Sequence, residues 1–270
     1  MPEKYVRRDG LPILLRHTGP TTLPQNPPKQ AGGSSIVCLH DAGLQSSVFA
    51  GLLDAISETQ SASAIAFDLP GHGRSGSLDS LPSVEAMAEM ARWVTEWCQI
   101  ERPVLVGHGM GALVALEWAR TRGDELGGLA LCGAGLALST SSETIETMRQ
   151  VTLGKAPRPF DPSRVAKSGG QDMMRRAYME GIQTDPRATL VDLEASRSWS
   201  DANAGALEIG CATRIVSGDA EHPGAREEAE ALAGRCAKAD LSEVADAAHF
   251  LPLEQPRALA EEVLKLAEAA

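Results

Sequence analysis

The stretch VLVGHGMGALVALEWA, residues 104–119, decides the fold, because an apolar run leads into a cluster of glycines and then into a helical pattern. This order predicts a buried strand, a sharp turn and a helix. Such a turn places its central residue at the edge of a sheet, next to the positive end of the helix that follows. The central residue here is Gly109, which has no side chain. The sequence therefore raises the question of what chemistry this turn supports.

Short apolar runs and helical patterns alternate on both sides of this turn. Strands are expected at 36–40, 64–69, 103–107, 126–134, 213–219 and 238–244, and helices at 46–57, 83–98, 109–120 and 254–269. This alternation predicts an α/β fold with right-handed crossovers and a mostly parallel central sheet flanked by helices. Two segments at 4–8 and 12–17, joined by Asp9 and Gly10, predict an antiparallel hairpin at the edge of that sheet.

One part of the chain breaks the alternation. Residues 136–201 contain helical patterns interrupted by proline and glycine, without a strand pattern. We therefore predict a core domain formed by residues 1–135 and 202–270, with a helical lid inserted at 136–201. A chain of 270 residues, 43% of them hydrophobic, can bury one substantial core of this kind.

The charge and residue composition of the chain argue against several classes of binding partner. The net charge of −11 and the absence of a basic cluster argue against binding to nucleic acid or to an anionic membrane. The five cysteines are scattered, and no signal peptide or membrane-spanning run is present, so we expect a cytoplasmic protein with reduced thiols. The histidines are too dispersed for a metal site and no dinucleotide motif occurs, so we expect no cofactor. The expected partner is a small-molecule substrate, and the expected state is a monomer or homodimer.

Polar residues follow most of the predicted strands. In open parallel sheets, reactive groups gather where the strands end, because the turns into the following helices open there. The residues at these positions are HDAG at 40–43, DLPGHGRSG at 68–76, GHGMG at 107–111, GDAE at 218–221 and His249. His40 and His72 are expected to hold loops by hydrogen bonds.

Together these motifs resemble the α/β-hydrolase fold superfamily, and in particular its esterase, lactonase and C–C hydrolase group. The nucleophile elbow of that superfamily, G-x-S-x-G, matches GHGMG, so Gly109 stands at the serine position. The order of nucleophile, acid and histidine implies Glu221 as the acid and His249 as the base, with Asp219 as a competing acid. Superfamily members with Asp at the elbow, which act on haloalkanes and epoxides, are disfavoured because residue 109 is glycine.

The resemblance also implies an oxyanion hole formed by the backbone N–H groups of Ala42 and Met110. The superfamily usually has glycine where this chain has Asp41, which is a second departure and places a carboxylate near the developing oxyanion. Asp41, His108 and Phe250 are candidates to line the pocket.

Glycine at the elbow leaves three interpretations. The first is a hydrolase of a small ester, lactone or similar carbonyl substrate, inactivated by loss of its serine. The second is an enzyme with a native glycine and no covalent nucleophile, such as a lyase, a cyclase or a direct hydrolase, in which His249 and Glu221 act as a general base on water or on a carbon acid. The third is a relative that binds a ligand without catalysis. The retained acid and histidine favour the first interpretation, and Asp41 counts against it because one inactivating change leaves it unexplained.

Overall fold

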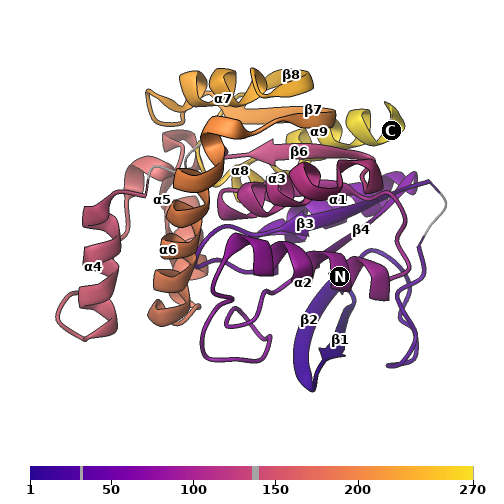
Figure 1. Cartoon of the computed structure of the whole chain (residues 1–270), viewed down its shortest axis with the longest axis horizontal. Coiled ribbons are helices and arrows are strands. Elements are labelled where there is room, and N and C mark those ends of the chain that lie inside the picture. Colours follow the sequence, from indigo (N-terminus) through magenta and orange to yellow (C-terminus); the bar gives the residue numbers. More distant parts are fainter. Residues whose placement is uncertain (31–32, 136–139, 270) are drawn as a thin grey trace.

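The computed structural model describes residues 1–30, 33–135 and 140–269, and these residues form one central sheet with helices on both faces (Figure 1). The sheet has eight strands in the order β1-β2-β4-β3-β5-β6-β7-β8. The strands are β1 (Glu3–Arg8), β2 (Leu11–His17), β3 (Ser34–Leu39), β4 (Ala62–Phe67), β5 (Val104–His108), β6 (Gly128–Cys132), β7 (Ile209–Gly218) and β8 (Cys236–Val244). Strands β3 to β8 pair in parallel, and the β1–β2 hairpin joins β4 antiparallel. The predicted α/β fold is confirmed.

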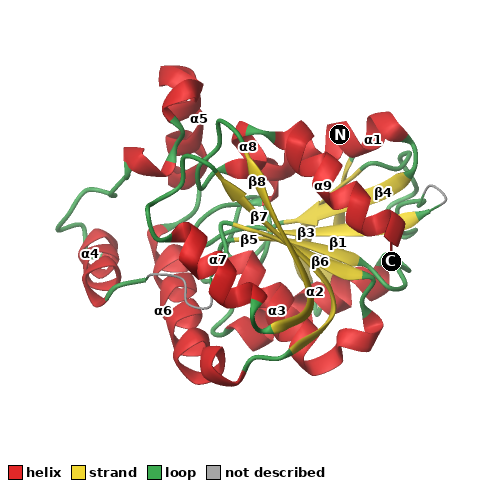
Figure 2. Ribbon diagram, turned by 90° about the horizontal axis from the view of Figure 1, so that it is seen from above, coloured by secondary structure: helices red, strands yellow, loops and turns green. Residues whose placement is uncertain are grey.

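The central strands are buried on both faces, which explains their continuous apolar sequences. Along β5, Val104 and Val106 face one hydrophobic core and Leu105 faces the other, as the two-residue period of a strand requires. Helices α2 (Val84–Trp97) and α3 (Met110–Arg122) cover one face, and α1 (Ala50–Thr59) and α9 (Pro256–Ala269) cover the other (Figure 2). No described helix is long and apolar enough to span a membrane.

Three details differ from the pattern read in the sequence. The helix expected at 254–269 is α9, which starts two residues later because Pro256 is its first residue, and a short helix α8 (Leu251–Glu254) precedes it. The helix α7 (Ala225–Ala233) was not predicted. Strand β7 begins at Ile209, four residues before the strand expected at 213–219. Its first residue, Ile209, already pairs with β8.

A helical segment, which we define as residues 140–206, connects β6 to β7. It contains α4 (Ser142–Thr152), η3 (Pro162–Arg164), η4 (Lys167–Gly169), α5 (Gly170–Ile182), α6 (Pro186–Asn203) and η5 (Ala204–Ala206). Figures 1 and 2 show α4, α5 and α6 together beyond one end of the sheet. Residues 136–139 of the predicted lid lie outside the described residues. Helix α6 ends at Asn203, two residues beyond the end predicted for the lid at 201. The function of the segment as a lid remains a prediction.

Candidate active site

The turn between β5 and α3 has the geometry that the sequence predicts. Gly109 joins the two elements with φ +54° and ψ −116°, a left-handed conformation that glycine adopts without strain. Its N–H donates to the carbonyl of Cys132 at 3.0 Å. A Cβ at Gly111 would overlap the backbone oxygen of Leu39, so glycine there lets α3 start directly against β3. The turn is therefore held in place by backbone contacts on two sides.

The side chain of Asp41 fills the space in front of Gly109. Its Oδ1 accepts hydrogen bonds from the N–H of Ala42 at 2.7 Å and from the N–H of Met110 at 2.8 Å. These are the two donors predicted to form the oxyanion hole. A Cβ built at residue 109 would overlap the carboxylate of Asp41. A carboxylate from the loop after β3 thus fills the space beside Gly109, the residue that stands at the serine position of the elbow pattern.

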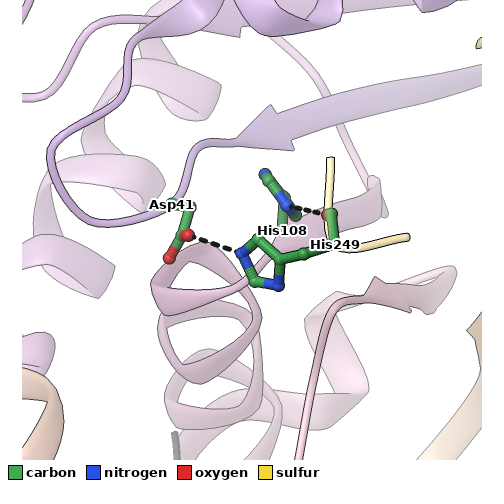
Figure 3. Close-up of side chains that lie close together, drawn as sticks. All are labelled: Asp41, His108 and His249. Carbon is green, nitrogen blue, oxygen red and sulfur yellow. Dashed lines mark hydrogen bonds and ion pairs between the residues drawn. The ribbon is translucent and has the colours of Figure 1, made fainter. Parts of the chain in front are cut away.

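His249 lies between two carboxylates. Its Nε2 donates to Oδ2 of Asp41 at 2.9 Å (Figure 3), and its Nδ1 lies 3.4 Å from Oε1 of Glu221. Glu221 comes from the turn after β7, and of the two acids weighed from the sequence it is the one placed at His249. Asp219 lies at the end of the same strand, where its N–H donates to the carbonyl of Val244.

These contacts set the charges in the site. Burial opposes the charged form of Asp41, but the hydrogen bond from His249 and its positive charge outweigh burial and lower the pKa of Asp41 well below its usual range. Burial and the charge of Arg164 oppose protonation of His249, but the hydrogen bonds to Asp41 and Glu221 outweigh both and raise its pKa. Both shifts favour an ion pair, with an anionic Asp41 and a cationic imidazole.

The helical segment contributes Arg164 to this site. Its Nη2 lies 3.1 Å from Oδ2 of Asp41, and its guanidinium stands over the ring of Phe250 at 5.3 Å from the centroid. The Arg164 side chain is 45% exposed, in contrast to 7% for Asp41. The ring of Phe250, predicted to line the pocket, packs edge-on against His249. No sequence motif pointed to Arg164, because η3 lies in a segment without recognisable signatures.

His108 supports the histidine loop from below. It is fully buried, and its Nε2 donates to the backbone carbonyl of His249 at 2.7 Å (Figure 3). Burial and the nearby charge of His249 lower the pKa of His108 to about 4, so the ring is neutral. Predicted as a pocket residue, His108 instead positions His249.

Asp41, His108 and His249 are also the described residues that come near a metal-binding arrangement. One ligand atom from each lies within 4.8 Å of the others. His249 and Asp41 are already hydrogen-bonded to each other, so an ion that bound both through Nε2 and Oδ2 would have to displace the proton between them. The geometry is better suited to proton transfer than to metal binding.

A second histidine–carboxylate pair lies behind the Asp41 loop. Nε2 of His72 lies 2.7 Å from Oδ2 of Asp192 on α6, and neither side chain is exposed. The same Oδ2 accepts from the N–H of Gly43 at 2.9 Å. The Nδ1 of His72 donates to the carbonyl of Pro70 at 3.0 Å, so both ring nitrogens face acceptors. Burial opposes protonation of His72, but the charge and hydrogen bond of Asp192 outweigh it and raise the pKa.

His40 lies beside His72, but its pKa is lowered whereas that of His72 is raised. Its Nε2 accepts from the N–H of Leu69 at 3.1 Å, and its Nδ1 donates to the carbonyl of Asp41 at 2.9 Å. Burial and the neighbouring His72 lower the pKa of His40 to about 4. Both histidines hold loops by hydrogen bonds, as the sequence suggested.

Comparisons with known proteins give one matching family model and many solved structures of similar fold. Residues 36–262 match the model of a family described as the alpha/beta hydrolase family. An enol-lactonase from Burkholderia xenovorans LB400 has a TM-score of 0.74 at 18% identity, covering 98% of this chain and 99% of that one. A thermophilic esterase from Thermogutta terrifontis has a TM-score of 0.78 at 20% identity, covering 100% and 99%. These two likenesses concern the fold.

A curated relative shares sequence over a shorter region. It is the dihydrolipoyllysine-residue acetyltransferase component of an acetoin cleaving system from Pseudomonas putida, 26% identical over 125 residues. The match covers 44% of this chain and 34% of the relative, so the chain spans about a third of that protein's length.

Proposed function

Since the chain belongs to the alpha/beta hydrolase family, we propose that it hydrolyses a small molecule with a native Gly109, and that the carboxylate of Asp41 replaces a serine hydroxyl. The proposal keeps the native glycine of the second interpretation and adds a role for the Asp41 carboxylate that this interpretation did not include. The observation that supports it is that a side chain at residue 109 would need the space that the Asp41 carboxylate fills. A Cβ built at residue 109 would overlap the Asp41 carboxylate, so a side chain at 109 requires the carboxylate to leave the position that it holds.

This overlap links the two departures from the superfamily pattern, Gly109 and Asp41. Loss of a serine in an otherwise ordinary hydrolase accounts for Gly109 alone. It does not account for a carboxylate held by Ala42, Met110, His249 and Arg164. A buried anion costs free energy unless it is paired and hydrogen-bonded, and Asp41 has four such partners. We therefore regard Gly109 and Asp41 as a matched pair.

His249 is the proton carrier in this proposal. Glu221 holds Nδ1, which fixes the ring, and Nε2 faces the Asp41 carboxylate. A histidine in this position can give a proton to a leaving atom and can later take one from water. The esterase and enol-lactonase likenesses make esters and lactones the first substrates to test, yet the two N–H donors that such substrates need are bound to Asp41.

A two-by-two set of variants tests the pairing. Native protein, Gly109→Ser, Asp41→Gly and the double variant are assayed on short p-nitrophenyl esters and on lactones. We expect little ester hydrolysis by either single variant. The double variant should gain at least about 10²-fold over both, because it has a hydroxyl beside His249 and an empty pair of N–H donors.

Two outcomes contradict the pairing. If Gly109→Ser alone matches the double variant, the chain is a serine hydrolase that lost its nucleophile. If no variant gains activity while all four stay folded by circular dichroism, the binding-relative interpretation is favoured. Asp219→Asn serves as the control for loss of an acid at the same edge of the sheet.

A further inference from the structure

We propose that Cys211 and Cys236 form a reversible disulfide, and that the oxidant is a small-molecule disulfide that reaches Cys211 through a cavity beside it. The two thiols belong to the neighbouring strands β7 and β8, near the points where these strands begin (Figure 1). The candidate active site lies where the parallel strands end, at the opposite end of the sheet. The cysteine pair therefore does not depend on the reaction proposed there.

A β-bulge brings the two cysteines toward one another. Ile209 pairs with Cys236 and Ala212 pairs with Lys238, so three steps along β7 match two steps along β8. In a regular ladder Cys211 would stand opposite Lys238, two residues from Cys236, whereas the bulge reduces this offset to one residue. Strands about 4.8 Å apart with an offset of about 3.3 Å place the two Cα atoms about 6 Å apart, inside the range of about 4.4 to 6.8 Å that disulfides span.

The two thiols also lie on the same face of the sheet. Both side chains are half-buried and pack against the hydrophobic core that contains Leu232 of α7. The hydroxyl of Thr213 lies against both thiols and donates to the carbonyl of Cys211 at 3.1 Å. Sγ of Cys236 donates to the carbonyl of Leu232 at 3.4 Å. Two sulfur atoms that share one hydroxyl lie close together, so a small change of side-chain rotamer brings them into bonding contact.

A cavity of about 460 Å³ gives a reagent access to one of the two thiols. Cys211 lines this cavity, together with Arg102, Asp124 and Lys238. These three charged residues are exposed, so the cavity opens to solvent. The remaining cysteines of the chain, Cys38, Cys98 and Cys132, are buried. Cys211 is therefore the thiol that we expect to react first.

The exchange takes place in two steps. The Cys211 thiolate attacks one sulfur of the small disulfide, the S–S bond of the reagent breaks, and the released thiolate takes up a proton. The Cys236 thiolate then attacks Sγ of Cys211, and the second half of the reagent leaves as a thiolate and is protonated. Two protein thiols and one small disulfide thus give one protein disulfide and two small thiols, and each proton lost by the protein is gained by a product.

The surroundings of the thiols determine the conditions under which this exchange is measurable. Burial raises the pKa of both thiols, and the contact with Thr213 opposes this effect only in part. Cys211 also raises the pKa of Cys236, as expected of two thiols that lie close together. Because the thiolate is the attacking species, the exchange is best measured in alkaline solution. The disulfide would close a loop over residues 211–236, which contains Glu221.

The native protein gives the decisive measurement. It is incubated with glutathione disulfide in alkaline solution, its remaining thiols are alkylated, and its peptides are analysed by mass spectrometry. We expect one linked pair of peptides, containing Cys211 and Cys236, and a fall in free thiols from five to three. Dithiothreitol should reverse both changes. The proposal is overturned if all thiols of the folded protein stay free, or if the link joins two chains in place of two strands.

Single variants test the order of attack. Cys236→Ser should retain one glutathione on Cys211, because no second thiol displaces it. In Cys211→Ser, Cys236 should react at least about tenfold more slowly than Cys211 does in the native protein. Cys98→Ala, which changes a buried thiol elsewhere in the core, is the matched control and should form the link as fast as the native protein.

Two results would contradict the assigned roles. A faster reaction at Cys236 than at Cys211 would show that the cavity does not direct the reagent. Separate glutathione adducts on both cysteines of the native protein, without a link between them, would show that the two thiols do not meet. If a variant does not fold, the peptide analysis of the native protein still decides whether the disulfide forms.

Discussion

The molecule contains two buried pairs of a histidine and an aspartate, and they differ in what surrounds them. In the elbow pair, His249 and Asp41, the side chains are 13% and 7% exposed, and Arg164 of the helical segment adds a partner that reaches solvent. In the sealed pair, His72 and Asp192, neither side chain is exposed. Both histidines have raised pKa values because a carboxylate outweighs the effect of burial.

The difference shows which feature makes such a pair reactive. The sealed pair uses its hydrogen bonds to fasten α6 to the loops of Gly43 and His72, and a substrate atom has no route between the two partners. The elbow pair has one carboxylate oxygen that faces proton donors and a partner on a separate segment. We infer that a buried ion pair is structural when all of its partners are buried in the fold. It can take part in a reaction when a substrate can replace one of those partners.

The largest expected effect separates the two histidines by activity. His249→Gln should lower the rate of hydrolysis by about 10² to 10⁴-fold, because the general acid and base is lost. His72→Gln should lower it by less than about tenfold, since its contacts act on loop position. Steady-state rates and circular dichroism spectra of both variants check this. Equal losses would remove the distinction between the pairs.

The next effect concerns stability, where the order of the pairs should reverse. Asp192→Ala leaves His72 without its counter-charge and the N–H of Gly43 without its acceptor, at zero exposure. Breaking a buried ion pair in this way costs about 3 to 5 kcal/mol. Asp41→Ala should cost less, because His249 keeps Glu221. Urea unfolding of the two variants measures the difference, and a larger cost for Asp41→Ala would contradict it.

Much of this site could be predicted because its signals are local. The alternation of strands and helices, the hairpin around Asp9 and the strand–turn–helix at Gly109 follow from short-range periodicity. Glu221 and His249 follow from their places after β7 and β8, since the ends of parallel strands meet at one edge. The sequence also drew attention to Asp41, as a departure near the expected oxyanion.

The contacts that the sequence could not supply join distant parts of the chain. Asp41 and Met110 are 69 positions apart, Asp41 and Arg164 are 123 apart, and His72 and Asp192 are 120 apart. No periodic pattern links such positions, because side-chain packing in three dimensions decides them. The glycine at 109 argued against a carboxylate at the elbow. The structure brings one there from a neighbouring strand, which a reading of residue 109 alone cannot reveal.

A smaller effect tests the acid of the elbow pair. Glu221→Gln removes one of the two carboxylates that favour protonated His249, while Asp41 remains. The loss of activity should therefore be well below the ~10⁴-fold seen where a histidine has a single acid partner. Steady-state rates of hydrolysis by the native protein and by Glu221→Gln measure this loss. Asp219→Asn should leave the rate unchanged.

The smallest expected effect is the pH dependence of the free energy of unfolding. It tests the charge state of each histidine–aspartate pair separately. The folded-state pKa values of His72 and His249 are raised, so each contributes stability that is fully present below the unfolded value of about 6.5 and is lost as pH rises through the folded value. The free energy of unfolding should therefore decline above neutral pH, by up to about 1.4 kcal/mol for each unit of pKa shift. His72→Gln and His249→Gln should each remove part of that decline. A decline that persists unchanged in both histidine variants would assign it to other groups and would leave the charge states of the two pairs unsupported.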